Sequence, residues 1–160
     1  IWHFCRLPPT AVRDKLGAVF RRKPVPNSVT STAAAPSSEA LAHFQRLFAL
    51  ETDCWDVHEA LAAGQPGFVL LDVRGPEHFR QGHIQGALGL PHGRITAARL
   101  SAWAPETLFV VYCAGPHCNG AARAAVRLSA LGRPVKMMIG GIAGWLDEGF
   151  PLIAGEGGAC

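Results

Sequence analysis

The 160-residue chain is predicted to adopt an α/β fold, a three-layer sandwich in which helices cover both faces of a mainly parallel sheet. Two short unbroken apolar runs, residues 68–71 and 108–112, are typical of strands buried on both faces, and both are too short to span a membrane. Helix-like segments alternate with such strands along the chain. With 49% hydrophobic and 17% charged residues, the composition supports one packed core and excludes wholesale disorder.

Apolar spacing and chain breakers predict the remaining elements in order. Leu41, Phe44 and Phe48 recur at helical spacing, which predicts an extra N-terminal helix over 38–50. We expect its apolar face to cover the sheet, the alternative being that it pairs with a second copy of the chain. Further helices are predicted at 55–63, 76–81, 96–103, 120–131 and 142–147, and further strands at 87–90 and 135–139.

The positive charge of the chain is concentrated at its N-terminus. Residues 1–28 hold six basic side chains and one acidic, whereas the formal charge of the whole chain is only +3. We therefore interpret 1–37 as a basic leader and Ser/Thr/Ala-rich linker, disordered or extraneous, with a transit peptide and a phosphate-binding arm as alternatives. The mildly acidic remainder, a domain at 51–153 with a flexible tail at 154–160, predicts neither a nucleic acid nor a membrane as partner.

Five cysteines form no pattern of paired disulfides. An odd number without such a framework favours a reducing compartment, which we take to be the cytoplasm, and makes a reactive thiol worth seeking.

One strand ends directly at a cysteine. Cys113 follows the apolar run 108–112, and a helix is expected to begin at Gly120. In an open parallel sheet ligands bind just beyond the carboxyl ends of the strands. Backbone N–H groups of the connecting loop and the positive end of the helix would favour a thiolate, which predicts a nucleophilic Cys113. The alternative is that Cys113 has no reactive role and is simply a small hydrophobic residue at the end of a strand. The candidate active-site loop consists of Ala114, Gly115, Pro116, His117, Cys118 and Asn119.

Four separated motifs resemble those of the rhodanese family of sulfurtransferases. They are LLDVR at 70–74, GHIQGA at 82–87, VVYC at 110–113 and GGIAGW followed by GFPL at 140–152. Their order along residues 52–152 corresponds to a single complete rhodanese domain.

The resemblance implies that Cys113 forms a persulfide. It would take a sulfane sulfur from a small donor such as thiosulfate and pass it to cyanide, a thiol or a protein thiol, without a metal or organic cofactor. It also implies that Asp72 and Arg74 brace the Cys113 loop by hydrogen bonds, where the alternative is a surface ion pair of little worth. We interpret His83 as structural and Trp145 as packing the last helix onto the sheet.

The loop departs from the family pattern. Between Cys113 and the helix end it is about two residues longer, and only His117 could supply a full positive charge, which leaves the donor open. Cys118 is either a resolving thiol or an inert residue facing the core. Asn119 is expected to cap the following helix, with a position in the pocket as the alternative.

Two alternative functions remain. A phosphatase or arsenate-reductase-like enzyme would need a Cys-x₅-Arg loop, but the sixth position after Cys113 is Asn119 and the next arginine is Arg123. A non-catalytic binding module would keep the fold without the reaction. A metal site of Cys113, His117, Cys118 and His92 lacks a second closely spaced ligand pair and is not expected. The sequence is compatible with a monomer or a weak dimer.

Overall fold

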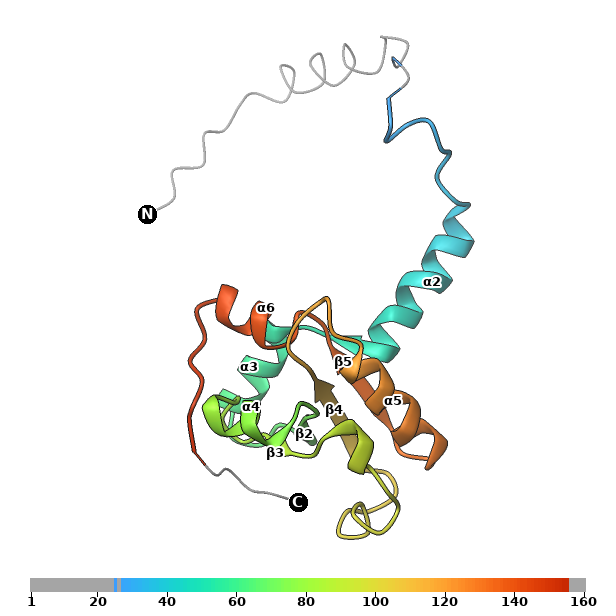
Figure 1. Cartoon of the computed structure of the whole chain (residues 1–160). Helices are drawn as coiled ribbons and strands as arrows, with labels where there is room; N and C mark the ends of the chain where they lie inside the picture. Colours follow the sequence, from blue (N-terminus) through green and yellow to red (C-terminus); the bar gives the residue numbers. More distant parts are fainter. Residues whose placement is uncertain (1–24, 26, 156–160) are drawn as a thin grey trace. The chain divides into compact units, whose positions relative to one another are not determined.

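The computed structural model describes residue 25 and residues 27–155 (Figure 1). Most of the predicted leader, and residues 156–160 of the predicted tail, lie outside the described residues. The chain divides into two compact units, Ile1–Glu39 and Ala40–Cys160. The second unit contains the sheet and the site described below.

Within the described residues, five parallel strands form one sheet in the order β1-β5-β4-β2-β3. The central strand β4 pairs with β2 along its full length, so that Asp72 lies opposite Tyr112. This parallel sheet confirms the predicted α/β class. The strands are β1 (Glu51–Thr52), β2 (Phe68–Asp72), β3 (Leu88–Gly89), β4 (Leu108–Tyr112) and β5 (Val135–Met138).

Helices lie on both faces of the sheet, because alternate residues of its buried strands point to opposite sides. Leu70 and Val110 belong to one hydrophobic cluster, with side chains from α3, α4 and α6. Leu71 and Val111 belong to the other, with side chains from α5. The helices are α2 (Ser37–Leu50), α3 (Cys54–Ala62), α4 (Pro76–Gln81), the short 3₁₀ helix η1 (His92–Arg94), α5 (Gly120–Ala130) and α6 (Gly141–Asp147). In the part of the chain that the structure describes, no helix is long and apolar enough to cross a membrane.

The expectation that the N-terminal helix covers the sheet is wrong. Helix α2 forms as predicted, but none of its residues is buried, and Phe44 and Phe48 are 58% and 77% exposed. Strand β1 begins at Glu51, immediately after the last helical residue, and lies at the edge of the sheet. No connecting turn is therefore present to fold the helix back over a face of the sheet.

The predicted helix at 96–103 is also wrong, because this segment forms successive turns. The amide of Leu100 is shared between the carbonyls three and four residues before it. The Arg133 guanidinium donates hydrogen bonds to the carbonyl oxygens of Leu100, Trp103 and Ala104. The carbonyls of Leu100 and Ala104 also accept the backbone amides of Trp103 and Thr107, three residues further on. A distant side chain and tight turns therefore satisfy these carbonyls, and no α-helix continues.

Candidate active site

Cys113 lies where the sequence predicted it, directly after the central strand β4. Its neighbours β2 and β5 run parallel to β4, so their carboxyl ends meet at the same edge of the sheet. The amide of Val73, just beyond β2, donates to the carbonyl of Tyr112 and extends this pairing up to the cysteine. Cys113 itself is only 6% exposed. Cys113 is thus held at the end of a paired strand, beneath its loop.

The start of helix α6 holds the first residues of the loop. The amides of Ile142 and Ala143 donate to the carbonyls of Cys113 and Ala114 at 3.0 and 2.9 Å. This contact requires a close approach at Gly141, where a β-carbon would lie 2.4 Å from the Cys113 oxygen. Its φ of +59° also favours glycine. Helix α6 therefore fixes the direction in which the loop leaves β4.

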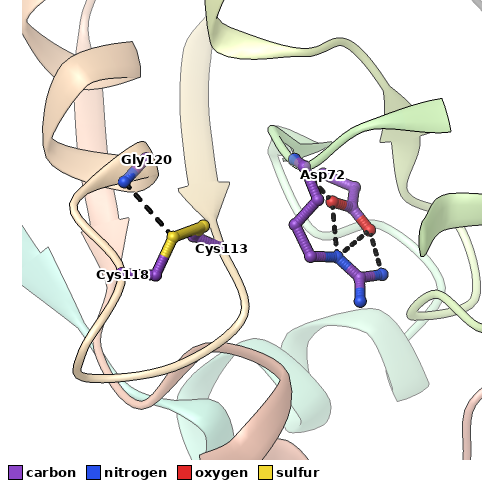
Figure 2. Close-up of a disulfide and its surroundings, with 5 residues drawn as sticks. Asp72, Cys113, Cys118 and Gly120 are labelled. Atoms are coloured by element: carbon purple, nitrogen blue, oxygen red, sulfur yellow. Dashed lines mark hydrogen bonds and ion pairs between the residues drawn. A yellow bond between two sulfur atoms is a disulfide. The ribbon is translucent and has the colours of Figure 1, made fainter. Parts of the chain in front are cut away.

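The loop returns the second cysteine to the first. A turn in which the Cys118 amide donates to the Gly115 carbonyl brings Cys118 back, and its sulfur is joined to that of Cys113 in a disulfide (Figure 2). The α-carbons of the two cysteines are 6.3 Å apart. Gly120 leaves room for this arrangement, since a β-carbon there would lie 2.7 Å from the Cys113 sulfur. The geometry agrees with the hypothesis of a resolving thiol.

A backbone amide reaches the sulfur of Cys118. The Gly120 N–H, at the start of the 11-residue helix α5, donates to the Cys118 sulfur at 3.4 Å. Among the described residues, the Gly120 amide is the backbone N–H group that donates a hydrogen bond to a sulfur of the disulfide. A cradle of amides around a free Cys113 thiolate stays a prediction for the reduced loop.

Four of the remaining loop residues are exposed to solvent. Ala114, Pro116, His117 and Asn119 are exposed. Asn119 occupies the N-cap position of α5, but its side chain makes no capping hydrogen bond, so the expected capping role is wrong. Its φ and ψ of −85° and 7° are close to helical, whereas a capping side chain needs an extended backbone to reach the helix amides.

A cavity of about 250 Å³ opens beside the two cysteines. Its walls come from the loop, the end of β5, and the starts of α5 and α6. No charged side chain is among its described lining residues, which are Cys113, Gly115, Pro116, Cys118, Ala121, Met137, Met138, Ile139, Gly140 and Gly141. In the part of the chain described, no three His, Cys, Asp or Glu side chains gather to hold a metal ion.

Asp72 and Arg74 form a buried ion pair, in contrast to the surface pair considered above. Their side chains are 0% and 10% exposed, and the guanidinium contacts both carboxylate oxygens, with Nη2 2.6 Å from Oδ2. The same Nη2 donates to the Gly82 carbonyl at 2.6 Å. These described hydrogen bonds tie β2 to the Gly82 turn rather than reaching the Cys113 loop, and Figure 2 shows Asp72 apart from the disulfide.

The ion pair is connected to the loop through Tyr112. Asp72 lies opposite Tyr112 in the sheet, and the Tyr112 hydroxyl accepts a hydrogen bond from the Ile84 amide. Burial, and after it the negative charge of Asp72, raises the pKa of Tyr112 above its ordinary range. Support of the loop by Asp72 and Arg74 therefore stays a proposal, acting through the residue that precedes Cys113.

Comparison with known proteins identifies the family. Residues 56–148, more than half of the chain, match the family model described as a rhodanese-like domain. The chain belongs to this family. A sulfurtransferase from Allochromatium vinosum is 33% identical over 89 residues, which cover 56% of this chain and 81% of the relative. An HTH-type transcriptional regulator from Mycobacterium tuberculosis is 35% identical over 93 residues, covering 54% of this chain but only 41% of the regulator.

Solved structures show the same fold. The BH2092 protein from Bacillus halodurans has a TM-score of 0.72 and 33% identity, over 74% of this chain and 87% of that protein. The rhodanese-like domain of the Alr3790 protein from Anabaena has a TM-score of 0.58 and 30% identity, over 65% of this chain and 78% of that domain. The resemblance drawn from the four sequence motifs is confirmed.

Two rhodanese-like motifs have structural roles, as predicted. His83 is 1% exposed, stacks on Phe79, and its Nδ1 lies 2.9 Å from the Phe79 carbonyl, to which it donates. Trp145 is 3% exposed, and its Nε1 donates to the Pro151 carbonyl at 3.0 Å. Both residues therefore hold neighbouring segments together.

Sequence reasoning overlooked Cys54, a free and buried cysteine behind the site. Its thiol donates to the carbonyls of Ile139 and Gly141, and so packs beneath the glycine pair that contacts the loop. Burial, and then the negative charges of Asp53 and Glu148, raises the pKa of this thiol to about 11. No sequence motif distinguishes Cys54, because its burial arises only when α3 packs against the start of α6.

We expect Cys54 to resist alkylation in the folded protein. In reduced protein at pH 8, iodoacetamide should label Cys113 and Cys118, as read by peptide mass spectrometry, whereas Cys54 stays protonated and unlabelled. Because its pKa is raised, this thiol stabilises the fold below pH 9, and that contribution is lost as the pH rises toward 11. As a control, unfolding the protein in denaturant should expose Cys54 and allow iodoacetamide to label it. Labelling of Cys54 at pH 8 as fast as that of Cys118 would contradict the structure.

Proposed function

We propose that the protein is a sulfurtransferase that carries sulfane sulfur as a persulfide on Cys113. The observation that carries the proposal is a cysteine at the carboxyl end of the central strand, beside a cavity and before the start of α5. Such a position favours a thiolate nucleophile. Membership of the rhodanese-like family, and the similar protein named as a sulfurtransferase, support the same reaction class.

The proposed reaction has two halves and needs no cofactor. The Cys113 thiolate attacks the outer sulfur of a donor such as thiosulfate, the bond to the sulfonate sulfur breaks, and sulfite leaves with the electron pair. An acceptor such as cyanide, a small thiol or a protein thiol then attacks the outer sulfur of the persulfide and regenerates the thiolate. Loop amides would stabilise the persulfide anion.

The phosphatase alternative has less support. Residues 114–120 contain no arginine or lysine, and phosphate transfer from a cysteine relies on a bidentate arginine. Arg123 lines a separate surface hollow with Asn119, Ala122, Val126 and Arg127, and not the cavity beside Cys113.

Intact mass spectrometry tests the proposal directly. Reduced protein incubated with thiosulfate and then desalted should release sulfite and transiently carry the added mass of one sulfur atom on Cys113. Release of phosphate from a phenyl phosphate ester would instead support the phosphatase. Absence of both reactions would favour a non-catalytic binding module. We place the enzyme in a reducing compartment such as the cytoplasm, where a free thiolate persists, as a monomer or weak dimer.

We expect thiosulfate to be a poor donor. Its two negative charges meet no cation among the described residues lining the cavity, so KM for thiosulfate should exceed about 1 mM. A persulfide of a small neutral thiol should have the higher kcat/KM. The exposed Pro116→Arg variant supplies a cation at the rim and should lower KM for thiosulfate alone. Steady-state kinetics with both donors check this, and an equal effect of the variant on both would contradict it.

A further inference from the structure

The loop brings the sulfur atoms of two cysteines close enough to form a covalent bond. The sulfurs of Cys113 and Cys118 are joined, and the backbone on either side of them is held by β4 and by the first turn of α5. The Cys113 carbonyl is also fixed by the Ile142 amide. The bond between the two sulfurs is therefore accommodated within the paired sheet and the intact helices around the loop.

The two sulfurs occupy different surroundings. Cys113 is buried at the strand end, whereas Cys118 is partly exposed and receives the Gly120 hydrogen bond at the start of α5. The positive end of a helix favours a thiolate, so Cys118 is placed to act as a nucleophile toward Cys113. Because Cys118 is more exposed than Cys113, a thiol from solution reaches the Cys118 sulfur of the disulfide more readily.

We infer that Cys118 is a second catalytic thiol, which attacks the persulfide on Cys113 and releases the sulfane sulfur as hydrosulfide. This inference rests on the proposed function. It adds a reductive activity, because the sulfur leaves as sulfide instead of passing to an external acceptor. The product of this step on the protein is the disulfide seen in the structure.

The step balances in atoms and electrons. The Cys118 thiolate attacks the inner sulfur of the Cys113 persulfide, the new Cys113–Cys118 bond forms, and the bond to the outer sulfur breaks. The persulfide first takes up a proton from solvent, and its outer sulfur then leaves with that electron pair and this proton as hydrosulfide. Two cysteine thiols are thereby oxidised by two electrons, and one sulfane sulfur is reduced by two.

The cycle closes with a low-molecular-weight thiol or dithiol as reductant. One thiolate attacks the partly exposed Cys118 sulfur, which forms a mixed disulfide and releases the Cys113 thiolate. A second thiolate then frees Cys118, and the oxidised reductant leaves as its own disulfide. Cys113 is then ready for the next donor molecule.

A single-turnover experiment tests the inference. Reduced, desalted full-length protein is mixed with thiosulfate without any external thiol, and sulfite, sulfide and intact mass are followed. Wild type should release sulfite and sulfide in equal amounts and end lighter by two hydrogen atoms. Cys118→Ser should release the same sulfite, retain the mass of one added sulfur, and form sulfide at least about 100-fold more slowly, because no thiol is held beside the persulfide. Cys54→Ser, which keeps a hydrogen-bond donor, is the matched control and should behave as wild type.

The outcomes separate the two proposals. Sulfite with a lasting sulfur adduct and no sulfide from wild type, or undiminished sulfide from Cys118→Ser, would overturn the role of Cys118 alone. Absence of both sulfite and adduct from wild type and Cys118→Ser would overturn the proposed function itself. Should Cys118→Ser fail to fold by circular dichroism, peptide mapping of wild type decides: a 113–118 disulfide formed in step with sulfide supports the inference, and sulfide without it overturns it.

Discussion

Replacement of Cys113 by serine is expected to abolish sulfur transfer. Serine is close in size to cysteine, so the fold should persist around this buried position. Its hydroxyl, however, forms no persulfide and is not ionised near neutral pH. We expect kcat/KM for thiocyanate formation from thiosulfate and cyanide to fall by at least about 10³-fold, as for loss of other catalytic nucleophiles.

The control for this experiment is again Cys54→Ser, a buried cysteine that is not bonded to the loop cysteines. It should retain activity, whereas Cys113→Ser should lose it with an unchanged circular dichroism spectrum. Equal activity of Cys113→Ser and wild type would show that another group carries the sulfur. Thiocyanate formed slowly by a variant that also keeps the sulfur adduct would point to Cys118 as the carrier.

Replacement of Arg74 by methionine is expected to destabilise the fold by about 3–5 kcal/mol. Methionine keeps much of the side-chain length, but it leaves the fully buried carboxylate of Asp72 without its ion-pair partner and the Gly82 carbonyl without a donor. Typical domains unfold with a free energy of about 5–15 kcal/mol, so this loss is a large fraction of the total. Urea unfolding, followed by tryptophan fluorescence, measures it.

An exposed ion pair in the same region is the matched control. Glu77 and Arg80 on α4 form an ion pair with both side chains more than half exposed. Glu77→Gln should therefore leave the urea midpoint of unfolding almost unchanged. The double variant Asp72→Asn with Arg74→Met should recover part of the loss, since it removes the unpaired charge. A loss below about 1 kcal/mol for Arg74→Met alone would mean that the pair is not buried as described.

Local patterns were sufficient for the elements that surround the site. Strand β4 and helix α4 have the predicted bounds, because an unbroken apolar run and a proline at the first helical turn act through their own residues. The position of Cys113 followed for the same reason: it is adjacent in sequence to a strand that only a sheet interior can accommodate. Strand β1, with two residues, is too short to have any period that a sequence pattern could reveal.

Partners distant in sequence escaped this reasoning. The segment 96–103 is predicted to be a helix, but Arg133, about 30 residues away, donates hydrogen bonds to the carbonyl oxygens of Leu100 and Trp103. The apolar face of α2 predicts a covering element, but the absence of a turn before β1 leaves that face exposed. Likewise, the burial of Cys54 depends on the packing of α3 against α6.

The sequence by itself determined the fold class, the family motifs and the cysteine at the strand end, because hydrophobic periodicity and chain breakers operate over a few neighbouring residues. Only the tertiary structure decided that Cys118 is bonded to Cys113, that the ion pair is buried and that the N-terminal helix is exposed. The Cys118 sulfur returns to Cys113 because a turn and helix α6 direct the loop, and Asp72 binds Arg74 in a buried site that no charge pattern reveals. The physical reason is that the distance between two side chains, and their burial, depend on which segments far apart in the sequence pack together.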